Sequence, residues 1–221
     1  MTPEADMPHF VGLAEPIPYG TIDPSVVVGY RASRGDNEPL VIGTAPHLRS
    51  NTVLYAASVI GDRFSTGHNV IIREECEIGD DVSVWSNSIV DYGCRIGDGV
   101  KIHSNCYVAQ FTEIGDRAFL APGVSIANDL YPGSERSADV MRGPKIRADV
   151  QIGVNATILP YVEIGEGAMI GSAAVVTKDV PPGMVAIGNP AVCTKRVVDL
   201  RPIEDRVDGI RTVADKAGTE S

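Results

Sequence analysis

The sequence predicts an all-β fold, a parallel β-helix of triangular section, on three observations. An aliphatic residue recurs at every sixth position from Ile42 to Ile126, and Thr66 is the one break in this series. The pair Gly-Asp recurs every eighteen residues, from Gly61-Asp62 to Gly115-Asp116. Small or apolar residues follow four positions after most of the aliphatic ones: Thr52, Ser58, Val70, Cys76, Val82, Ser88, Cys94, Val100, Cys106, Thr112, Ala118 and Val124. Neither a helical nor a simple strand period gives these offsets, so the chain is a repeat architecture.

The eighteen-residue period means that three hexads make one coil, with a corner between successive strands. Corners need a backbone conformation that Gly, Asn and Asp tolerate best. Residues of this kind recur at the fourth position of the hexads on one face: Asn69, Asn87, Asn105, Gly123 and Asn155. Stacked coils pair their backbones and bury their inward aliphatic side chains in columns, each worth about 1.5 to 3 kcal/mol.

Residues 1–41 precede the regular array. Met1 to Tyr19 is rich in Pro and acidic residues and is expected to be irregular. Two further hexads start at Ile22 and Val28 but are out of phase with the main array, and Arg34 to Val41 is expected to be the loop that absorbs the difference.

The β-helix domain is expected to span residues 42–192, with one inserted loop at 131–145. The aliphatic period stops after Ile126 and resumes at Ile146, and the polar stretch between them is a candidate functional loop. Residues 193–221 form a tail, in which 197–217 is expected to be a short amphipathic helix and the last four residues are expected to fray.

Length and charge limit the function. A chain of 221 residues that is mostly repeat is expected to be one domain, and a net charge of −10 argues against nucleic acid or an anionic membrane surface as the main partner. No signal peptide or long apolar run is present, so a cytoplasmic location is expected. Three of the four cysteines fall at inward positions and no CxxC pair occurs, so neither a disulfide framework nor a metal site is expected.

One outward column carries the candidate chemistry. On the face that includes Thr66, the second hexad position points out of the prism. If the inserted loop preserves the coil count, this column runs Gly67, Trp85, His103, Ala121, Gly153 and Gly171. Rings at one end and small residues at the other would suit a polar substrate beside a slender, extended ligand. The alternative is that Gly is simply common at this position of such repeats.

The hexads, the inserted loop and the closing segment from Ile170 to Ala191 resemble the hexapeptide-repeat acyltransferases, which fold as a left-handed β-helix. Within that superfamily, the segments Thr66 to Cys76 and Ile102 to Cys106 resemble the branch that acetylates amino sugars carried on nucleotides. The left-handed sense is implied by this resemblance alone.

The resemblance implies a homotrimer, with active sites between neighbouring prisms and acetyl-CoA as cosubstrate along the groove. Small residues at Ala121, Gly153, Gly171 and Ser172 would let the pantetheine arm approach the backbone. Lys178 would meet the CoA phosphates, unless it is an ordinary surface lysine.

One departure from the family concerns the acceptor. Galactoside and xenobiotic acetyltransferases carry a catalytic histidine just before the inserted loop, whereas this chain has Asn128 and Asp129 there. An alcohol needs a base to attack a thioester, and an amine needs less help. The absent histidine therefore favours N-acetylation, with Asn128 or Asp129 orienting the amine.

The remaining candidates bind or activate the acceptor. His103 can be a base or a ligand to sugar or phosphate, and His68, at a corner, can be functional or structural. Arg73, Glu74 and Glu75 form a charged cluster that either holds the sugar nucleotide or faces solvent. Trp85 together with Tyr131 and Arg142 of the inserted loop completes the candidate substrate-binding set.

The sequence therefore predicts an acetyl-CoA-dependent N-acetyltransferase acting on an amino sugar, specifically a nucleotide-linked 3- or 4-amino deoxyhexose. An O-acetyltransferase of a sugar hydroxyl is the first alternative. A γ-type carbonic anhydrase would use the same fold and three zinc-binding histidines, but no histidine follows His103. A non-catalytic β-helix scaffold is the third alternative.

Overall fold

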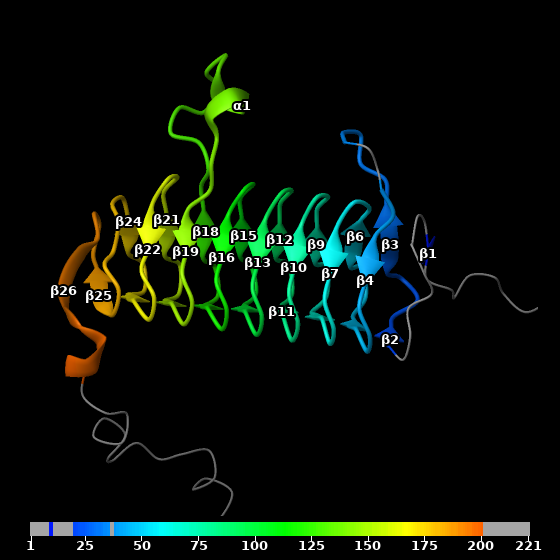
Figure 1. The fold of residues 1–221 in the computed structure, drawn as a ribbon, viewed down its shortest axis with the longest axis horizontal. Helices are drawn as coiled ribbons and strands as arrows, with labels where there is room; N and C mark the ends of the chain where they lie inside the picture. Colours follow the sequence, from blue (N-terminus) through cyan, green and yellow to red (C-terminus); the bar gives the residue numbers. More distant parts are fainter. Residues whose placement is uncertain (1–8, 11–19, 36–37, 201–221) are drawn as a thin grey trace, which may run out of the picture.

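The protein is a parallel β-helix of triangular section, consistent with the left-handed form that the sequence predicts (Figure 1). The computed structural model describes residues 9–10, 20–35 and 38–200. Short strands, most of them two residues long, follow one another around three faces, and each except β26 pairs in parallel with its equivalents one coil away.

Three sheets form the faces, here called A, C and D. Sheet A contains β1 (His9–Phe10), β3 (Val27–Tyr30), β6 (Val53–Tyr55), β9 (Ile71–Ile72), β12 (Ile89–Val90), β15 (Tyr107–Val108), β18 (Ser125–Ile126), β21 (Thr157–Ile158) and β24 (Val175–Val176). Sheet D contains β4 (Val41–Ile42), β7 (Val59–Ile60), β10 (Glu77–Ile78), β13 (Arg95–Ile96), β16 (Glu113–Ile114), β19 (Lys145–Ile146) and β22 (Glu163–Ile164). Sheet C contains β2 (Thr21–Ile22), β5 (His47–Leu48), β8 (Ser65–Thr66), β11 (Ser83–Val84), β14 (Lys101–Ile102), β17 (Phe119–Leu120), β20 (Gln151–Ile152), β23 (Met169–Ile170), β25 (Met184–Ile187) and β26 (Val192–Arg196).

The register confirms the aliphatic columns that the sequence predicts. Leu120, for example, pairs with Ile102 on one side and with Ile152 on the other, across the inserted loop. The inward aliphatic and small residues of the array form one continuous buried core. The hexads at Ile22 and Val28 also stack in register, under Leu48 and Leu54, so they form two sides of the first coil.

The corners explain two repeating signals. The predicted corner residues Asn69, Asn87, Asn105, Gly123 and Asn155 all have a positive φ, between 55° and 75°. The glycines of the Gly-Asp pairs do not, because the positive φ falls two residues later, as at Arg63 and Asp81.

The glycines are instead required by the aspartate of the next coil. Oδ1 of Asp80 accepts a hydrogen bond from the backbone amide of Asp62 at 2.7 Å, and Oδ1 of Asp98 accepts one from that of Asp80 at 2.8 Å. A Cβ added to Gly79 would lie 2.2 Å from Oδ1 of Asp98. The repeat is thus a carboxylate ladder along one edge of the prism, which sequence reasoning attributed to the bend.

The break in the aliphatic series at Thr66 is a buried hydroxyl pair. Oγ1 of Thr66 lies 2.9 Å from Oγ1 of Thr52, and both side chains are buried. Thr66 Oγ1 also accepts a hydrogen bond from the Arg49 amide at 3.1 Å, and Thr52 Oγ1 donates to the Gly67 carbonyl at 3.3 Å. The two polar groups are therefore satisfied inside an otherwise apolar column.

Two insertions leave the prism at the same corner, between sheets A and D, and project on the same side (Figure 1). One connects β3 to β4, as predicted from the phase shift. The other connects β18 to β19 and contains a single helical turn, α1 (Ser137–Val140), and we call this segment, residues 127–144, the arm. The other two corners are uninterrupted through the main array, so the coil count is preserved.

The end of the β-helix differs from the prediction. The segment Val192–Arg196 is not part of a loose tail but forms β26, which pairs antiparallel with β25 and covers the end of sheet C. One 3₁₀ turn, η2 (Val197–Asp199), follows it, and the rest of the helix expected over 197–217 lies outside the described residues. The helices of the described part of the chain are far too short to cross a bilayer.

Candidate functional site

The predicted outward column exists on sheet C. The strand register places Gly67, Trp85, His103, Ala121, Gly153 and Gly171 at equivalent positions of successive coils. Because the arm leaves at another corner, it does not interrupt this face. The column is therefore an exposed track whose side chains change from polar and aromatic to very small along its length.

Three rings stack at the middle of the track. The ring centroid of His103 lies 3.6 Å from that of Trp85 and 4.9 Å from that of Phe119, with tilts of 54° and 55°. Trp85 keeps 43% of its surface exposed. Burial among these rings, together with the charge of Lys101, lowers the pKa of His103. Its imidazole is therefore neutral at pH 7 and able to accept a proton.

A hollow of about 360 Å³ adjoins the exposed side of Trp85, toward the N-terminal coils. Its walls come from three neighbouring coils of sheet C and from the following corner: His47, Arg49, Ser65, Thr66, Gly67, His68, Trp85, Ser86 and Ser104. Gly67 lines the hollow and is required by the stacking of coils, because a Cβ there would lie 2.3 Å from the Ser86 amide nitrogen. His68 lines the hollow with Nδ1 2.7 Å from Ser50 Oγ.

Charges are distributed unevenly around the prism. In the described chain, the outward positions of sheet C from His47 onward carry no Asp or Glu, and they include the cations Arg49 and Lys101. Three of the four histidines also lie on this face or at its corner. The neighbouring aspartates at the preceding corner are engaged by backbone amides or by Arg63. An acidic protein therefore presents one face that is free of carboxylates and suited to an anionic ligand.

The far end of the track is lined by the residues predicted to hold a cofactor. Ala121 is buried, whereas Gly153 and Gly171 are half-buried and Ser172 is exposed at the adjacent corner. A Cβ on Gly153 would lie 2.5 Å from the Ser172 amide nitrogen, so the glycine is required by the stacking of coils as well as by any ligand. Lys178 is exposed at the corner between sheets A and D, away from this track.

Arg73 and Glu74 belong to a separate polar cluster at the end of sheet A. The Arg73 guanidinium donates two hydrogen bonds to the buried Glu74 carboxylate, at 2.8 and 2.9 Å, and lies 3.6 Å from Asp91. Burial would raise the pKa of Glu74, but the bonds from Arg73 and the charge of Arg34 lower it. Asp91 in turn accepts hydrogen bonds from Tyr107 and Gln110, and burial followed by the bond to Asp91 raises the pKa of Tyr107 to about 12.

The same cluster anchors the arm. Nδ2 of Asn128 donates to Oε1 of Gln110 at 2.7 Å and lies 3.2 Å from Sδ of Met141, while the Arg142 amide donates to the Asn128 carbonyl at 2.8 Å. The two ends of the arm are therefore held together at its base. Asn128 thus has a defined structural role that the sequence analysis did not foresee.

The remaining arm residues lie farther out. The Asp129 carboxylate accepts hydrogen bonds from the Tyr131 amide and the Ser137 hydroxyl. Tyr131 is 73% exposed, and Arg142 is exposed as well. Within one chain, Asn128, Asp129, Arg73 and Glu74 do not share a face with His103, so the structure separates the predicted residues into two groups.

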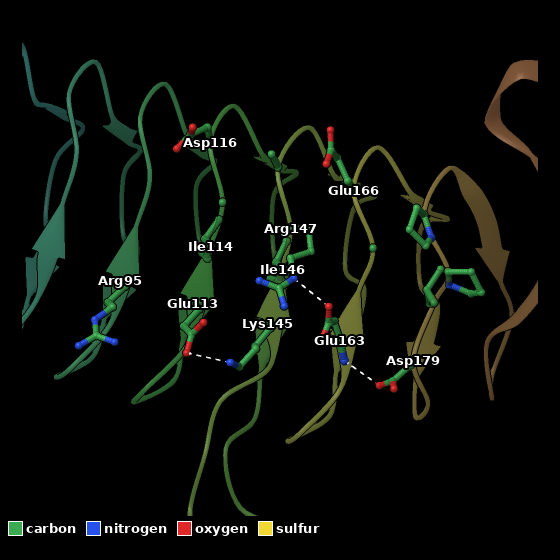
Figure 2. Close-up of a pocket in the computed structure, with 16 residues that line it drawn as sticks. Arg95, Glu113, Ile114, Asp116, Lys145, Ile146, Arg147, Glu163, Glu166 and Asp179 are labelled. Carbon is green, nitrogen blue, oxygen red and sulfur yellow. Dashed lines mark hydrogen bonds and ion pairs between the residues drawn. The ribbon is translucent and has the colours of Figure 1, made fainter.

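A second hollow, of about 770 Å³, lies on sheet D (Figure 2). Five carboxylates and three cations line it, and several of them pair with each other: Lys145 with Glu113 at 3.4 Å and Arg147 with Glu163 at 2.8 Å. Its acidic excess disfavours an anionic cofactor, and its cations are already occupied. We therefore place the candidate site on sheet C.

Sequence reasoning missed two residues of this site, His47 and Arg49. Both occupy outward positions of the coil that precedes Gly67, in register with Ser65 and Gly67. The predicted column could have been extended by one coil to include Arg49, since Leu48 belongs to the same inward series as Thr66.

Two family models of hexapeptide repeats match parts of the β-helix. A family model described as bacterial transferase hexapeptide (six repeats) matches residues 93–128 and 143–178, on either side of the arm. A second, described as hexapeptide repeat of succinyl-transferase, matches residues 70–110.

The chain is similar to serine acetyltransferases of Salmonella typhimurium and of Escherichia coli K12, each 41% identical over 76 residues. These matches cover 34% of this chain and 28% of each relative, so the chain spans less than a third of their length. Among solved structures, the polySia-specific acetyltransferase NeuO has a TM-score of 0.53 and 22% identity, covering 92% of this chain and 90% of its own. That likeness concerns the fold.

Proposed function

Because the chain belongs to the hexapeptide-repeat acyltransferase superfamily, we propose that it is an acetyl-CoA-dependent acetyltransferase that acts on the amine of an amino sugar. The acceptor is a nucleotide-linked 3- or 4-amino deoxyhexose. The observation that carries this proposal is the carboxylate-free face of sheet C, with Trp85 and His103 at one end and small residues at the other.

The acceptor sugar stacks on Trp85, whose exposed ring offers an apolar face to the C–H groups of a pyranose. The acetyl-CoA arm lies against Ala121, Gly153 and Gly171, where short side chains leave the backbone accessible. The reacting amine and thioester then meet beside His103, between the two subsites.

The reaction requires one nucleophile and one proton acceptor. The lone pair of the sugar amine attacks the thioester carbonyl, the C–N bond forms and the C–S bond breaks, and CoA leaves as the thiolate. The amine nitrogen must lose a proton, which neutral His103 accepts and can return to the thiolate sulfur. Products are the N-acetylated sugar and CoA, and no other reactant is needed.

The polar groups of the other face act across an interface in this proposal. In a homotrimer, the arm and the end of sheet A of one chain would face sheet C of its neighbour, and Lys178, Asn128, Asp129, Tyr131 and Arg142 would then reach a site that their own chain does not complete. The superfamily membership supports this assembly.

The test is a thiol-release assay with acetyl-CoA against amino and hydroxy sugars, each free and nucleotide-linked. We expect turnover with an amino sugar, and the highest kcat/KM with a nucleotide-linked 3- or 4-amino deoxyhexose. Turnover with hydroxyl acceptors alone would contradict N-acetylation, and the absence of turnover with every acceptor would contradict the proposal.

O-acetylation of a sugar hydroxyl is the second candidate, and one observation favours it. His103 is held on the track and neutral at pH 7 because burial lowers its pKa, which is what an alcohol nucleophile requires of a base. The two candidates differ in the assay above, because paired acceptors that carry an amine or a hydroxyl at the same carbon separate them directly.

A further inference from the structure

We propose that the hollow beside Trp85 binds an anionic group of the acceptor, a phosphate or a carboxylate, through the Arg49 guanidinium. This inference rests on the proposed function in placing the acceptor, rather than the acyl donor, at this end of the track. It adds a binding residue and a requirement for negative charge on the substrate.

Arg49 has no ion-pair partner among the described residues. Its side chain is exposed and lines the hollow, and no carboxylate of the described residues lies within 4.0 Å of it to form an ion pair. By contrast, Arg63, Arg73, Arg117 and Arg147 each have a carboxylate partner at 2.8 Å or closer. A guanidinium that is left without an internal partner in an acidic protein is available to an external anion, and its planar fork matches phosphate and carboxylate oxygens.

The surroundings of Arg49 also favour an anion. His47 and His68 line the same hollow, and Ser65, Ser86 and Ser104 supply hydroxyl groups. Among the described residues, the one outward carboxylate of the column is Asp23, which lies one coil before Arg49, on the side away from the hollow. The hollow thus combines one permanent cation, two titratable imidazoles and several donors, with no acidic side chain in its lining.

The spacing along the track fits an acceptor that carries its charge at one end and its nucleophile at the other. Coils are about 4.8 Å apart, so Arg49 and His103, three coils apart, have α-carbons separated by about 14 Å. Arg49 and Gly67 line the same hollow, and Trp85 lies between Arg49 and His103 along the track. An anion at Arg49, a pyranose on Trp85 and the reacting group at His103 follow one another along the track, with the coil of Gly67 between Arg49 and Trp85.

Direct binding tests this without requiring turnover. Trp85 is the only tryptophan of the chain and lines the hollow, so its fluorescence reports on this site alone. Inorganic pyrophosphate and glucuronate would be titrated into the full-length protein at low ionic strength, the first representing a phosphate and the second a carboxylate. The variants are Arg49→Gln and, as a matched charge change on sheet D, Arg95→Gln.

We expect saturable quenching by at least one of the two anions in the wild type and in Arg95→Gln, with a Kd at least tenfold higher in Arg49→Gln. Equal Kd values in wild type and Arg49→Gln, or no saturable change with either anion, would overturn the proposal. Circular dichroism and thermal melting establish that each variant is folded. If Arg49→Gln does not fold, Arg49→Lys takes its place, because it retains the charge but not the planar guanidinium.

Two further measurements separate this inference from the proposed function. Saturating CoA should leave the Kd for the anion unchanged, and competition would instead place the donor phosphates in the hollow and overturn the proposal. Arg49-dependent anion binding without acetyl transfer to any amino sugar would contradict the proposed function alone. Acetyl transfer with an unchanged KM in Arg49→Gln would contradict this inference alone.

Discussion

The imidazole of His103 lies against the indole of Trp85, with ring centroids 3.6 Å apart, and it is enclosed on its other side by Phe119. This contact holds the one histidine of the track and covers part of its ring. The sugar-binding ring of Trp85 and the proposed proton acceptor His103 are therefore in contact, so a change at Trp85 should also change the pKa of His103.

Replacing His103 by Asn should lower kcat by about 10²- to 10⁴-fold if it is the base. The active form is neutral, so the wild-type rate should rise with pH through the His103 pKa, which burial places below its ordinary value of about 6.5, and level off near neutrality. The thiol-release assay measures both. Circular dichroism establishes that the variant is folded, and an undiminished rate in His103→Asn would remove His103 from the mechanism.

Replacing Trp85 by Ala should raise the His103 pKa toward its ordinary value, because the ring becomes exposed to water. NMR titration of the imidazole Cε1 proton measures this, with the His103→Asn spectrum identifying the signal. Trp85→Phe keeps an apolar ring and should retain more of the shift. The same midpoint in all three proteins would show that Trp85 does not set the protonation of His103.

Replacing Thr66 by Val should destabilise the protein by about 1 to 3 kcal/mol, although valine restores the aliphatic series. The change leaves the Arg49 amide without its acceptor and Thr52 without its hydroxyl partner. Urea unfolding measures the loss. The double change Thr52→Val with Thr66→Val should cost less than the sum of the single changes, since no hydroxyl is then left unpaired, and strict additivity would count against a coupled pair.

The carboxylate ladder should make part of the stability dependent on acid. Hydrogen bonds from Thr44, backbone first, lower the pKa of Asp62 below its ordinary 3.8, so the ionised carboxylate stabilises the folded state above that pH. Its contribution should decline as the pH falls through the lowered pKa. Asp62→Asn should therefore lower the urea midpoint more at pH 7 than at pH 3. An equal difference at both pH values would contradict this account, and Asp139→Asn in the arm controls for the loss of one charge.

Replacing Asn128 by Ala should loosen the arm. The amide of Asn128 joins Gln110 to Met141 at the base of the arm, and its removal frees both ends. Hydrogen exchange of residues 129–141 should become faster, while exchange in the coils of sheet C stays unchanged. A fall in kcat without any change in exchange would instead assign Asn128 the amine-orienting role that the sequence suggests.

The columns were predictable because the constraint that creates them is strict. A shift of one residue would point a buried aliphatic side chain toward solvent, so the six-residue period identifies the inward residues of every strand. The eighteen-residue period identifies which hexads stack on each other. This is why Trp85 and His103 could be placed on one face from the sequence, and why Ala121 and Gly153 could be aligned across the arm.

Pairings between side chains were not predictable in the same way. The period does not say that Glu74 is buried against Arg73, that Gly79 makes room for Asp98, or that Arg49 lacks a carboxylate partner within the described residues, because each depends on side-chain directions at a corner. The strand Val192–Arg196 also escaped prediction. Its pairing covers the exposed end of a sheet, a requirement that arises only once the sheet exists.

The stacking of sheet C has one more consequence, which concerns how the specificity of such a protein can change. Positions along the track come at fixed intervals, because a strand of sheet C can be added or removed only with a whole coil, whereas an insertion at a corner, such as the arm, leaves the spacing of the coils unchanged. The distance between the anion-binding position at Arg49 and the reacting position at His103 can therefore change only in steps of about 4.8 Å. An acceptor of intermediate length has to be accommodated by the conformation of a long side chain such as Arg49, because the spacing of the coils is fixed.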